Sequence, residues 1–534
     1  MDTLIRGGRL IDGSGNPWRY ADIAIADQRI RAIAPPGLLD PAGARTVIDA
    51  TGHIVCPGFI DIQSHSIIPF LSDGRAISKV TQGVTTEIMG ELWTPGPFGG
   101  LRQSPFLSGF GVVSAELERE ARQWTRFGHW MDAMLARGVS VNVGSFLGGA
   151  TVREFAMGWR DGAPSADELK LMRRATSEAM ADGAFGIAPA LIYPPSSFSP
   201  DEELIAGAAE VGRAGGVYIV HMRSEGSRLL ESIADNVHLS RTANCPVEIY
   251  HLKVTGAANW PLMERAVAAI AQARADGVDI AANMYPYVAS GTGLAAAMPD
   301  WVQADGKFEQ NLRDPATRQR ITAEMLGPNA RGTMAGPDGV LVVGLRRAEH
   351  QQYNGKTLDV VATMRGEAWT DTLMNIVLSE GPWAAAIYFL MNEANLPLQM
   401  RQPWVKFSTD APGIDPSRPD RVLVHPRAYG TYTRILGRYV REQGVMTWED
   451  AIRKMTSSVA DRLYLHGRGE IRIGFQADVV VFDPETVIDR ATFIEPHQVS
   501  VGIRDVWVNG TRVLQNGTHT GAKPGQALYG PART

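Results

Sequence analysis

The chain has 534 residues and a formal net charge of −5, with 44% hydrophobic and 20% charged residues. These values are typical of a globular protein with more than one domain, and the absence of a basic cluster argues against a nucleic-acid partner. Two cysteines, no signal-peptide pattern and no apolar run of about 18 residues predict a cytoplasmic protein without a membrane span.

The two ends of the chain have the pattern of a small β domain. In residues 1–57, apolar and polar positions alternate roughly by two and are interrupted by Gly, Asp and Asn. Residues 467–534 repeat this pattern and then end in a tail without periodicity. Strand-only segments at both ends predict one small β-sandwich built from both termini.

Residues 58–466 alternate between strand-length apolar runs and helix-length amphipathic segments. We count eight such runs, from "GFIDIQSH" to "WVKFSTDAP", with helical segments such as "SADELKLMRRATSEAMADG" between them. Eight β–α repeats predict an α/β protein whose catalytic domain is a (β/α)8 TIM barrel. A segment at about 295–400 is too long for a loop, so we expect an inserted subdomain before the eighth strand.

Candidate metal-binding or acid–base side chains stand at the ends of five predicted strands: His65, Glu91, His221, His251 and Asp410. The carboxyl ends of barrel strands converge on one mouth, so these residues should meet in space. Imidazoles and carboxylates suit zinc or a similar divalent ion. A single histidine is more often a core residue, and a strand-end acid can simply cap a helix. Three histidines at matching strand ends, among only 11 in the chain, favour a metal site.

Eight sequence segments occur in a distinctive order: "PGFIDIQSH", "GVTTEIMGE", "LIYPPSSFS", "HMRSEG", "HLK", "YPY", "STDAPG" and "HPRAYGTYTRILGRYVRE". Together they resemble the D-aminoacylase (N-acyl-D-amino-acid deacylase) branch of the amidohydrolase superfamily, over nearly the whole chain. The resemblance implies metal-dependent hydrolysis of the amide bond of an N-acyl amino acid, with a D preference, or of a related amide such as a dipeptide.

The resemblance also implies a metal site, from which this chain departs at two positions. It places a tightly held zinc on histidines that match His221 and His251 and on a cysteine after the second strand. Leu92 stands at the cysteine position and cannot bind a metal. In the first strand, Gln63 replaces one histidine of a weaker metal position. We therefore expect about one zinc ion per chain, with Glu91 as the third ligand.

Glu91 raises a physical objection. Neighbouring side chains on a regular strand face opposite ways, so Glu91 should point away if the Leu92 position faces the metal. A turn that begins at Gly90, together with the length of the glutamate side chain, could re-aim it. Otherwise, Glu91 would form an ion pair with a nearby loop.

The remaining expectations concern catalysis and the substrate. Asp410 should take a proton from water and return it to the leaving nitrogen, with His65 orienting either Asp410 or the substrate carbonyl. The resemblance implies four residues around the carboxylate of a small-molecule substrate: Lys253, Arg427, Tyr285 and, close by, Tyr193. Arg and Lys suit a carboxylate, although each of the four could instead be solvated or packed in a loop.

Two other functions stay open. A cyclic amide hydrolase of the hydantoinase or dihydroorotase type would share the barrel mouth, but such relatives usually carry a modified lysine after the fourth strand, and "GAFGIAPALIY" has none. A catalytically inactive barrel could bind a carboxylated ligand, but it would have little need of a base at Asp410. The sequence leaves open the oligomeric state, the acyl group and the side chain of the substrate.

Overall fold

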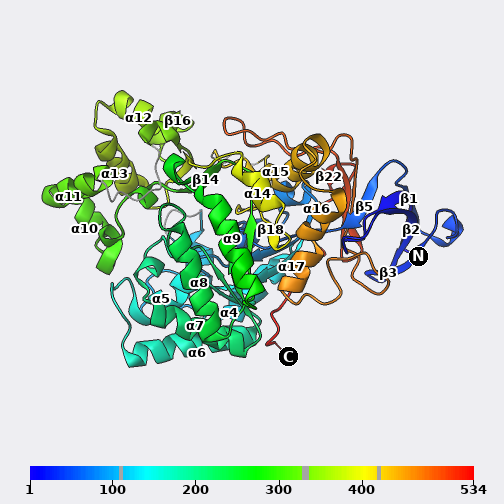
Figure 1. The fold of residues 1–534 in the computed structure, drawn as a ribbon, viewed down its shortest axis with the longest axis horizontal. Coiled ribbons are helices and arrows are strands. Elements are labelled where there is room, and N and C mark those ends of the chain that lie inside the picture. Colours follow the sequence, from blue (N-terminus) through cyan, green and yellow to red (C-terminus); the bar gives the residue numbers. More distant parts are fainter. Residues whose placement is uncertain (108–111, 328–335, 418–422, 534) are drawn as a thin grey trace.

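The computed structural model describes residues 1–107, 112–327, 336–417 and 423–533. Figure 1 shows a sheet of terminal strands at one end of the molecule and helices α10 to α13 at the opposite end, with parallel strands and their helices between. Within the described ranges, no helix combines the length and the apolar character needed to cross a membrane.

Strands from both ends of the chain pair in one nine-stranded sheet. Their order is β22-β21-β20-β19-β5-β1-β2-β3, and β4 pairs with β1. The bounds are Thr3–Leu10 (β1), Arg19–Ala26 (β2), Arg29–Ala34 (β3), Thr46–Asp49 (β4), Ile54–Pro57 (β5), Val479–Phe482 (β19), Ile503–Val508 (β20), Thr511–Gln515 (β21) and Thr518–His519 (β22). Alternate apolar residues such as Ile23 and Ile25 are buried against Val479 and Val481. The terminal sheet leads directly into the first parallel strand, because only Gly58 lies between β5 and β6.

The middle of the chain carries parallel strands in two sheets, β6-β7-β8 and β18-β13-β12-β11-β10-β9. The bounds are Phe59–Asp61 (β6), Val84–Met89 (β7), Asn142–Ser145 (β8), Leu147–Gly148 (β9), Gly186–Ala188 (β10), Val217–Val220 (β11), Val247–Ile249 (β12), Ile280–Met284 (β13) and Val405–Phe407 (β18). Only Phe146 separates β8 from β9, and an isolated parallel bridge pairs Ser64 with Ala411, just beyond β6 and β18. The predicted α/β fold is therefore confirmed.

Amphipathic helices lie between the parallel strands, and others follow the last of these strands. The main ones are α4 (Phe127–Arg137), α5 (Gly149–Met157), α6 (Ala166–Asp182), α7 (Asp201–Arg213), α8 (Leu229–Ala243), α9 (Leu262–Ala275), α15 (Arg427–Arg434) and α16 (Trp448–Met455). Helices α6 to α9 pack side by side in chain order. Helix α6 begins with a capping box between Ser165 and Glu168 and ends at Gly183, whose φ of 105° suits glycine. The helix thus ends at Asp182, within the segment that the sequence analysis gives as helical.

A separate layer forms between β13 and β18. It contains a four-stranded sheet in the order β14-β17-β15-β16 and the helices α10 to α13. The bounds are Ala289–Gly293 (β14), Val340–Val342 (β15), Lys356–Thr357 (β16), Ala385–Phe389 (β17), Phe308–Arg313 (α10), Pro315–Leu326 (α11), Leu358–Arg365 (α12) and Trp369–Glu380 (α13). This layer has its own apolar core, which includes Leu373, Ile376 and Tyr388. Strands β14 and β17 line a cavity of about 920 Å³.

The C-terminal tail forms backbone hydrogen bonds with two other segments. It first contacts β8 and the residues just before it, and then the turn that follows α6. The backbone N–H groups of Gly525 and Leu528 donate to the carbonyls of Val139 and Val143, and that of Gly530 donates to Gly183. A Cβ atom on Gly525 would lie 2.0 Å from the Val141 carbonyl oxygen, so this close approach requires glycine.

Candidate metal centre

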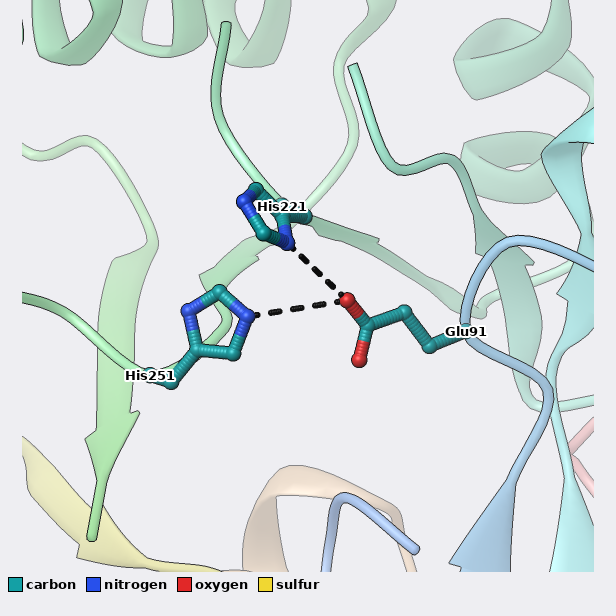
Figure 2. Close-up of side chains that lie close together, drawn as sticks. All are labelled: Glu91, His221 and His251. Carbon is teal, nitrogen blue, oxygen red and sulfur yellow. Dashed lines mark hydrogen bonds and ion pairs between the residues drawn. The ribbon is translucent and has the colours of Figure 1, made fainter. Parts of the chain in front are cut away.

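Glu91, His221 and His251 converge from the ends of three parallel strands. Glu91 Oε1 lies 3.1 Å from His221 Nδ1 and 3.6 Å from His251 Nε2. The three side chains are buried, and their potential ligand atoms all lie within 4.8 Å of one another. Figure 2 shows the Glu91 carboxylate directed at both imidazoles from the opposite side of the site.

The backbone around Glu91 removes the objection raised by strand alternation. Strand β7 ends at Met89, and Gly90 and Leu92 have positive φ values of 107° and 67°. A Cβ atom on Gly90 would lie 2.1 Å from the Phe146 carbonyl oxygen, so only glycine fits this turn. The chain is therefore no longer an alternating strand at Glu91, and the carboxylate faces the imidazoles while Leu92 lines the cavity.

His65 and Asp410 form a second group of potential ligands that shares Glu91. His65 Nε2 lies 2.9 Å from Asp410 Oδ1 and 3.5 Å from Glu91 Oε2. The other Asp410 oxygen, Oδ2, lies 2.7 Å from Arg427 Nη1. Asp410 has a φ of 49° and His251 one of 33°, both in a region that non-glycine residues rarely adopt. Such strain is common where the surrounding structure fixes a functional side chain.

A buried network beneath Asp410 joins the first and last parallel strands. Lys79 Nζ lies 2.6 Å from both Asp61 Oδ2 and Thr409 Oγ1. The Thr409 backbone N–H donates to Asp61 Oδ1 at 3.0 Å. The side chains of Lys79 and Asp61 are fully buried, so each charge depends on its partner. The network therefore holds the residue next to Asp410 on both its backbone and its side chain.

Burial and neighbouring charges shift the pKa values of Glu91, His221 and His251 in different directions. Burial raises the pKa of Glu91, but hydrogen bonds from His221 and His251 outweigh it and hold that pKa well below its usual value. Burial lowers the pKa of His221. Burial and Lys253 also act to lower the pKa of His251, yet the Glu225 and Asp410 carboxylates raise it to about 9.

The pKa of Asp410 is below its ordinary value. Burial opposes its ionisation, but the charges of Arg427 and His251 and the hydrogen bond with His65 favour the carboxylate more strongly. Asp410 is therefore an ionised carboxylate, and His65 lies between it and Glu91.

The residues expected around a substrate carboxylate already have partners. Lys253 Nζ lies 2.6 Å from Glu225 Oε1 and 2.6 Å from His251 Nδ1. The Arg427 guanidinium stacks 4.6 Å from the Tyr285 ring centre, in addition to its ion pair with Asp410. The Tyr285 hydroxyl is buried without a hydrogen-bond partner among the described residues.

All nine predicted site residues line one cavity of about 920 Å³. The inserted layer covers part of this cavity with Thr292, Trp383 and Leu390. Thr292 Oγ1 lies 2.6 Å from the Tyr193 hydroxyl, and the Tyr193 and Trp383 rings are in contact, with centres 5.2 Å apart. The inserted layer and the parallel strands therefore enclose the same space.

Glu225 is a candidate site residue that is not among the residues predicted from the sequence. Its Oε1 atom lies 3.1 Å from His251 Nδ1 and 3.7 Å from His221 Nε2, the nitrogens that face away from Glu91. Burial raises its pKa, but Lys253 and the two histidines lower it more, so Glu225 is ionised. Carboxylates in this position orient metal-binding imidazoles. The spacing of four residues from His221 in "HMRSEG" was the available signal.

The donor set fits a divalent ion of the zinc class. Two imidazole nitrogens and one carboxylate oxygen converge, and such a set with one open position is typical of catalytic zinc sites. Neither cysteine can contribute a ligand here, because Cys56 and Cys245 are buried outside the cavity lining.

The amidohydrolase family model matches residues 46–514 of the chain. The chain is 33% identical over 537 residues to the D-aminoacylase of Alcaligenes xylosoxydans xylosoxydans, with 99% of this chain and 97% of that protein covered. It is 31% identical over 529 residues to the N-acyl-D-glutamate deacylase of the same organism, with 99% and 96% covered.

A solved structure of N-acyl-D-glutamate deacylase from Bordetella bronchiseptica is also similar. It superposes with a TM-score of 0.82 at 30% identity and covers 99% of each chain. That protein was crystallised with zinc and a phosphonate inhibitor that mimics the tetrahedral intermediate of its reaction.

A first prediction concerns protons and metal. With a pKa of about 9, His251 is protonated at pH 6.5, whereas His221, with a lowered pKa, is largely neutral. A metal ion must displace the His251 proton, so metal affinity should fall as the pH falls below 9. Calorimetric titration of metal-free protein with Zn²⁺ at pH 6.5, in buffers of different ionisation enthalpy, should show about one proton released per ion. No proton release would contradict the assigned state of His251.

A second prediction concerns Glu91. The change Glu91→Gln keeps the shape but removes the charge, so metal affinity should fall by at least the 10- to 100-fold that loss of an outer partner typically costs. Competition with a chromogenic chelator measures this. Glu210→Gln is a matched control, because Glu210, on α7, is similarly buried but pairs with Arg173 on α6. Equal affinities for Glu91→Gln and the parent protein would remove Glu91 from the ligand set.

Proposed function

The chain belongs to the amidohydrolase family, and on that premise we propose that it is a zinc-dependent hydrolase of the amide bond of an N-acyl amino acid. One observation carries the proposal: a single cavity holds a ligand cluster, the ionised base Asp410 and the cations Lys253 and Arg427. The names of the similar proteins support a D-amino acid as substrate, with a related amide such as a dipeptide as a close variant.

We take the two parallel sheets as one (β/α)8 barrel of residues 58–466. The adjacency of β8 and β9 and the Ser64–Ala411 bridge support this closure. Residues 1–57 and 467–534 form the small β domain, which the pairing of β5 with β19 supports. The inserted layer then covers the mouth of the barrel, where active sites of this fold lie.

The ligand cluster accounts for the metal. His221 Nδ1, His251 Nε2 and Glu91 Oε1 would hold about one zinc ion, and zinc in such a site polarises a carbonyl group and lowers the pKa of water. Glu225 supports the two imidazoles from their far nitrogens, which keeps the near nitrogens directed at the ion.

Asp410 accounts for the proton transfers. Its lowered pKa keeps it ionised near neutral pH, so it can accept a proton from the attacking water. It then donates that proton to the amide nitrogen as the C–N bond breaks, which releases a neutral amine. His65, 2.9 Å from Asp410 Oδ1, holds the carboxylate in place during both transfers.

The cations account for recognition of the substrate carboxylate. Arg427 uses Nη1 for Asp410 and Nη2 for the Gly291 carbonyl, and its Nε has no hydrogen-bond partner in the described structure. Arg427 Nε and the unpaired Tyr285 hydroxyl can therefore bind the substrate carboxylate. Lys253, which lines the same cavity, adds a positive charge. Cyclic amide hydrolysis is disfavoured, because the segment from Gly186 to Leu191 contains no lysine.

A third prediction tests Asp410. The change Asp410→Asn removes the base but not the shape, so turnover of an N-acyl-D-amino acid should fall by about 100- to 10,000-fold. Zinc content should stay at the parent value. Asp415→Asn, in the same segment but paired with Arg75, should retain turnover within a few-fold. If Asp410→Asn also stays within a few-fold, the base lies elsewhere.

A fourth prediction tests Arg427. Loss of a charged hydrogen bond costs about 1.5–3 kcal/mol, so Arg427→Met should raise KM by roughly 10- to 150-fold. Arg427 also lowers the pKa of Asp410, so without it the base becomes protonated at a higher pH than in the parent. Assays at pH 8 therefore isolate the effect on binding, and the acid limb of the pH–rate profile should move to higher pH.

The matched control is Arg434→Met, because Arg434 lies on the same helix but pairs with Asp489. The parent enzyme should also bind a substrate whose carboxylate is replaced by an amide about as poorly as Arg427→Met binds the acid. Equal KM values for the acid and the amide would refute carboxylate recognition.

A further inference from the structure

Gln63 makes a direct hydrogen bond to the proposed metal ligand Glu91. Its amide Nε2 donates to Glu91 Oε2 at 2.6 Å, and its Oε1 accepts from Ser408 Oγ at 3.3 Å. Gln63 is 1% exposed, so this bond is made away from solvent. An ionised carboxylate only accepts hydrogen bonds, so the amide must present its NH2 group to Glu91. The bond leaves the other oxygen, Oε1, facing His221 and His251.

Glu91 belongs to two overlapping groups of potential ligands. One group is Glu91 with His221 and His251, and the other is Glu91 with His65 and Asp410. Paired metal ions in enzymes lie about 3.5–4 Å apart, a distance that the two oxygens of one carboxylate can bridge. The shared Glu91 would therefore allow an ion in each group. The contacts of each group decide whether both positions can be filled.

Two carboxylate oxygens of the second group have partners from outside the group, Arg427 and Gln63, and a third has a partner within it. Asp410 Oδ1 pairs with His65, Asp410 Oδ2 pairs with Arg427, and Glu91 Oε2 accepts from Gln63. The Gln63 NH2 group also has no lone pair to offer an ion. Arg427 meanwhile supplies the positive charge that a second ion would bring to Asp410.

We propose that Gln63 sets the number of metal ions at one. Its amide anchors Glu91 through Oε2 for the first ion, and it places a hydrogen-bond donor where a second ion would need a ligand. The inference rests on the proposed metal function of Glu91, His221 and His251. It assigns the positioning of that ligand set to a residue that does not itself touch the ion.

Three substitutions separate the two roles of Gln63. Gln63→Met removes the anchor, so the dissociation constant for zinc should rise by about 10- to 100-fold, as for other outer partners of metal ligands. Gln63→Glu keeps the shape but replaces the NH2 group with an oxygen that can bind metal, so this variant should hold two ions. Gln63→His offers a neutral lone pair and should also hold two ions, which keeps the test intact if the charged variant does not fold.

Gln399→Met is the matched control for the loss of a buried glutamine. Gln399 is 2% exposed, and its amide donates to the Asn395 carbonyl at 3.4 Å within helix α14 (Asn395–Met400). This variant should hold one ion with the affinity of the parent protein.

The experiment is equilibrium dialysis of each variant against a series of buffered Zn²⁺ concentrations, followed by elemental analysis. The expected result is one ion for the parent and Gln63→Met, with weaker binding in the latter, and two for Gln63→Glu and Gln63→His. The inference is overturned if the parent binds two ions tightly, if the folded gain-of-ligand variants saturate at one, or if Gln63→Met retains parent affinity.

Hydrolysis of an N-acyl-D-amino acid is assayed in the same samples. A parent protein that holds one ion but does not hydrolyse this substrate would refute the proposed function and leave the role of Gln63 standing. An active parent whose Gln63 variants match it in ion number and affinity would refute only the role of Gln63.

Discussion

The buried negative charge of Glu91 imposes the main constraint on the centre of this protein. A carboxylate shielded from water stays ionised only where N–H groups and positive charges surround it. His221 and His251 face one of its oxygens, and Gln63 and His65 face the other. These four residues come from three different strands, so the parallel sheets must bring their ends together to stabilise one side chain.

A second layer of buried charge keeps this arrangement rigid. Lys79 and Asp61 hold Thr409, and Glu225 faces the far nitrogens of both imidazoles. Removing one member of a buried pair typically costs about 3–5 kcal/mol, so these contacts resist rearrangement. The positive φ of Asp410 is therefore held by its neighbours, which keep its carboxylate next to His65.

Local sequence patterns were enough to predict that side chains far apart in the chain line one cavity. Apolar runs that end in polar residues predict that His65, His221 and Asp410 lie together, and all three line this cavity. Side-chain direction was harder, because the alternation rule argued against Glu91 until the turn at Gly90 was known. The bonds of Gln63 to Glu91 and of Arg427 to Asp410 link residues 28 and 17 positions apart, and no periodicity predicts such pairs.

The central claim is that a glutamate completes the metal site where a cysteine would be expected. Anomalous diffraction at the zinc edge, from crystals of zinc-loaded protein, tests it most directly. We predict one peak per chain, with Glu91 Oε1, His221 Nδ1 and His251 Nε2 each about 2.0–2.2 Å from it. A peak bound by the two histidines and water alone, with Glu91 turned away, would contradict the account.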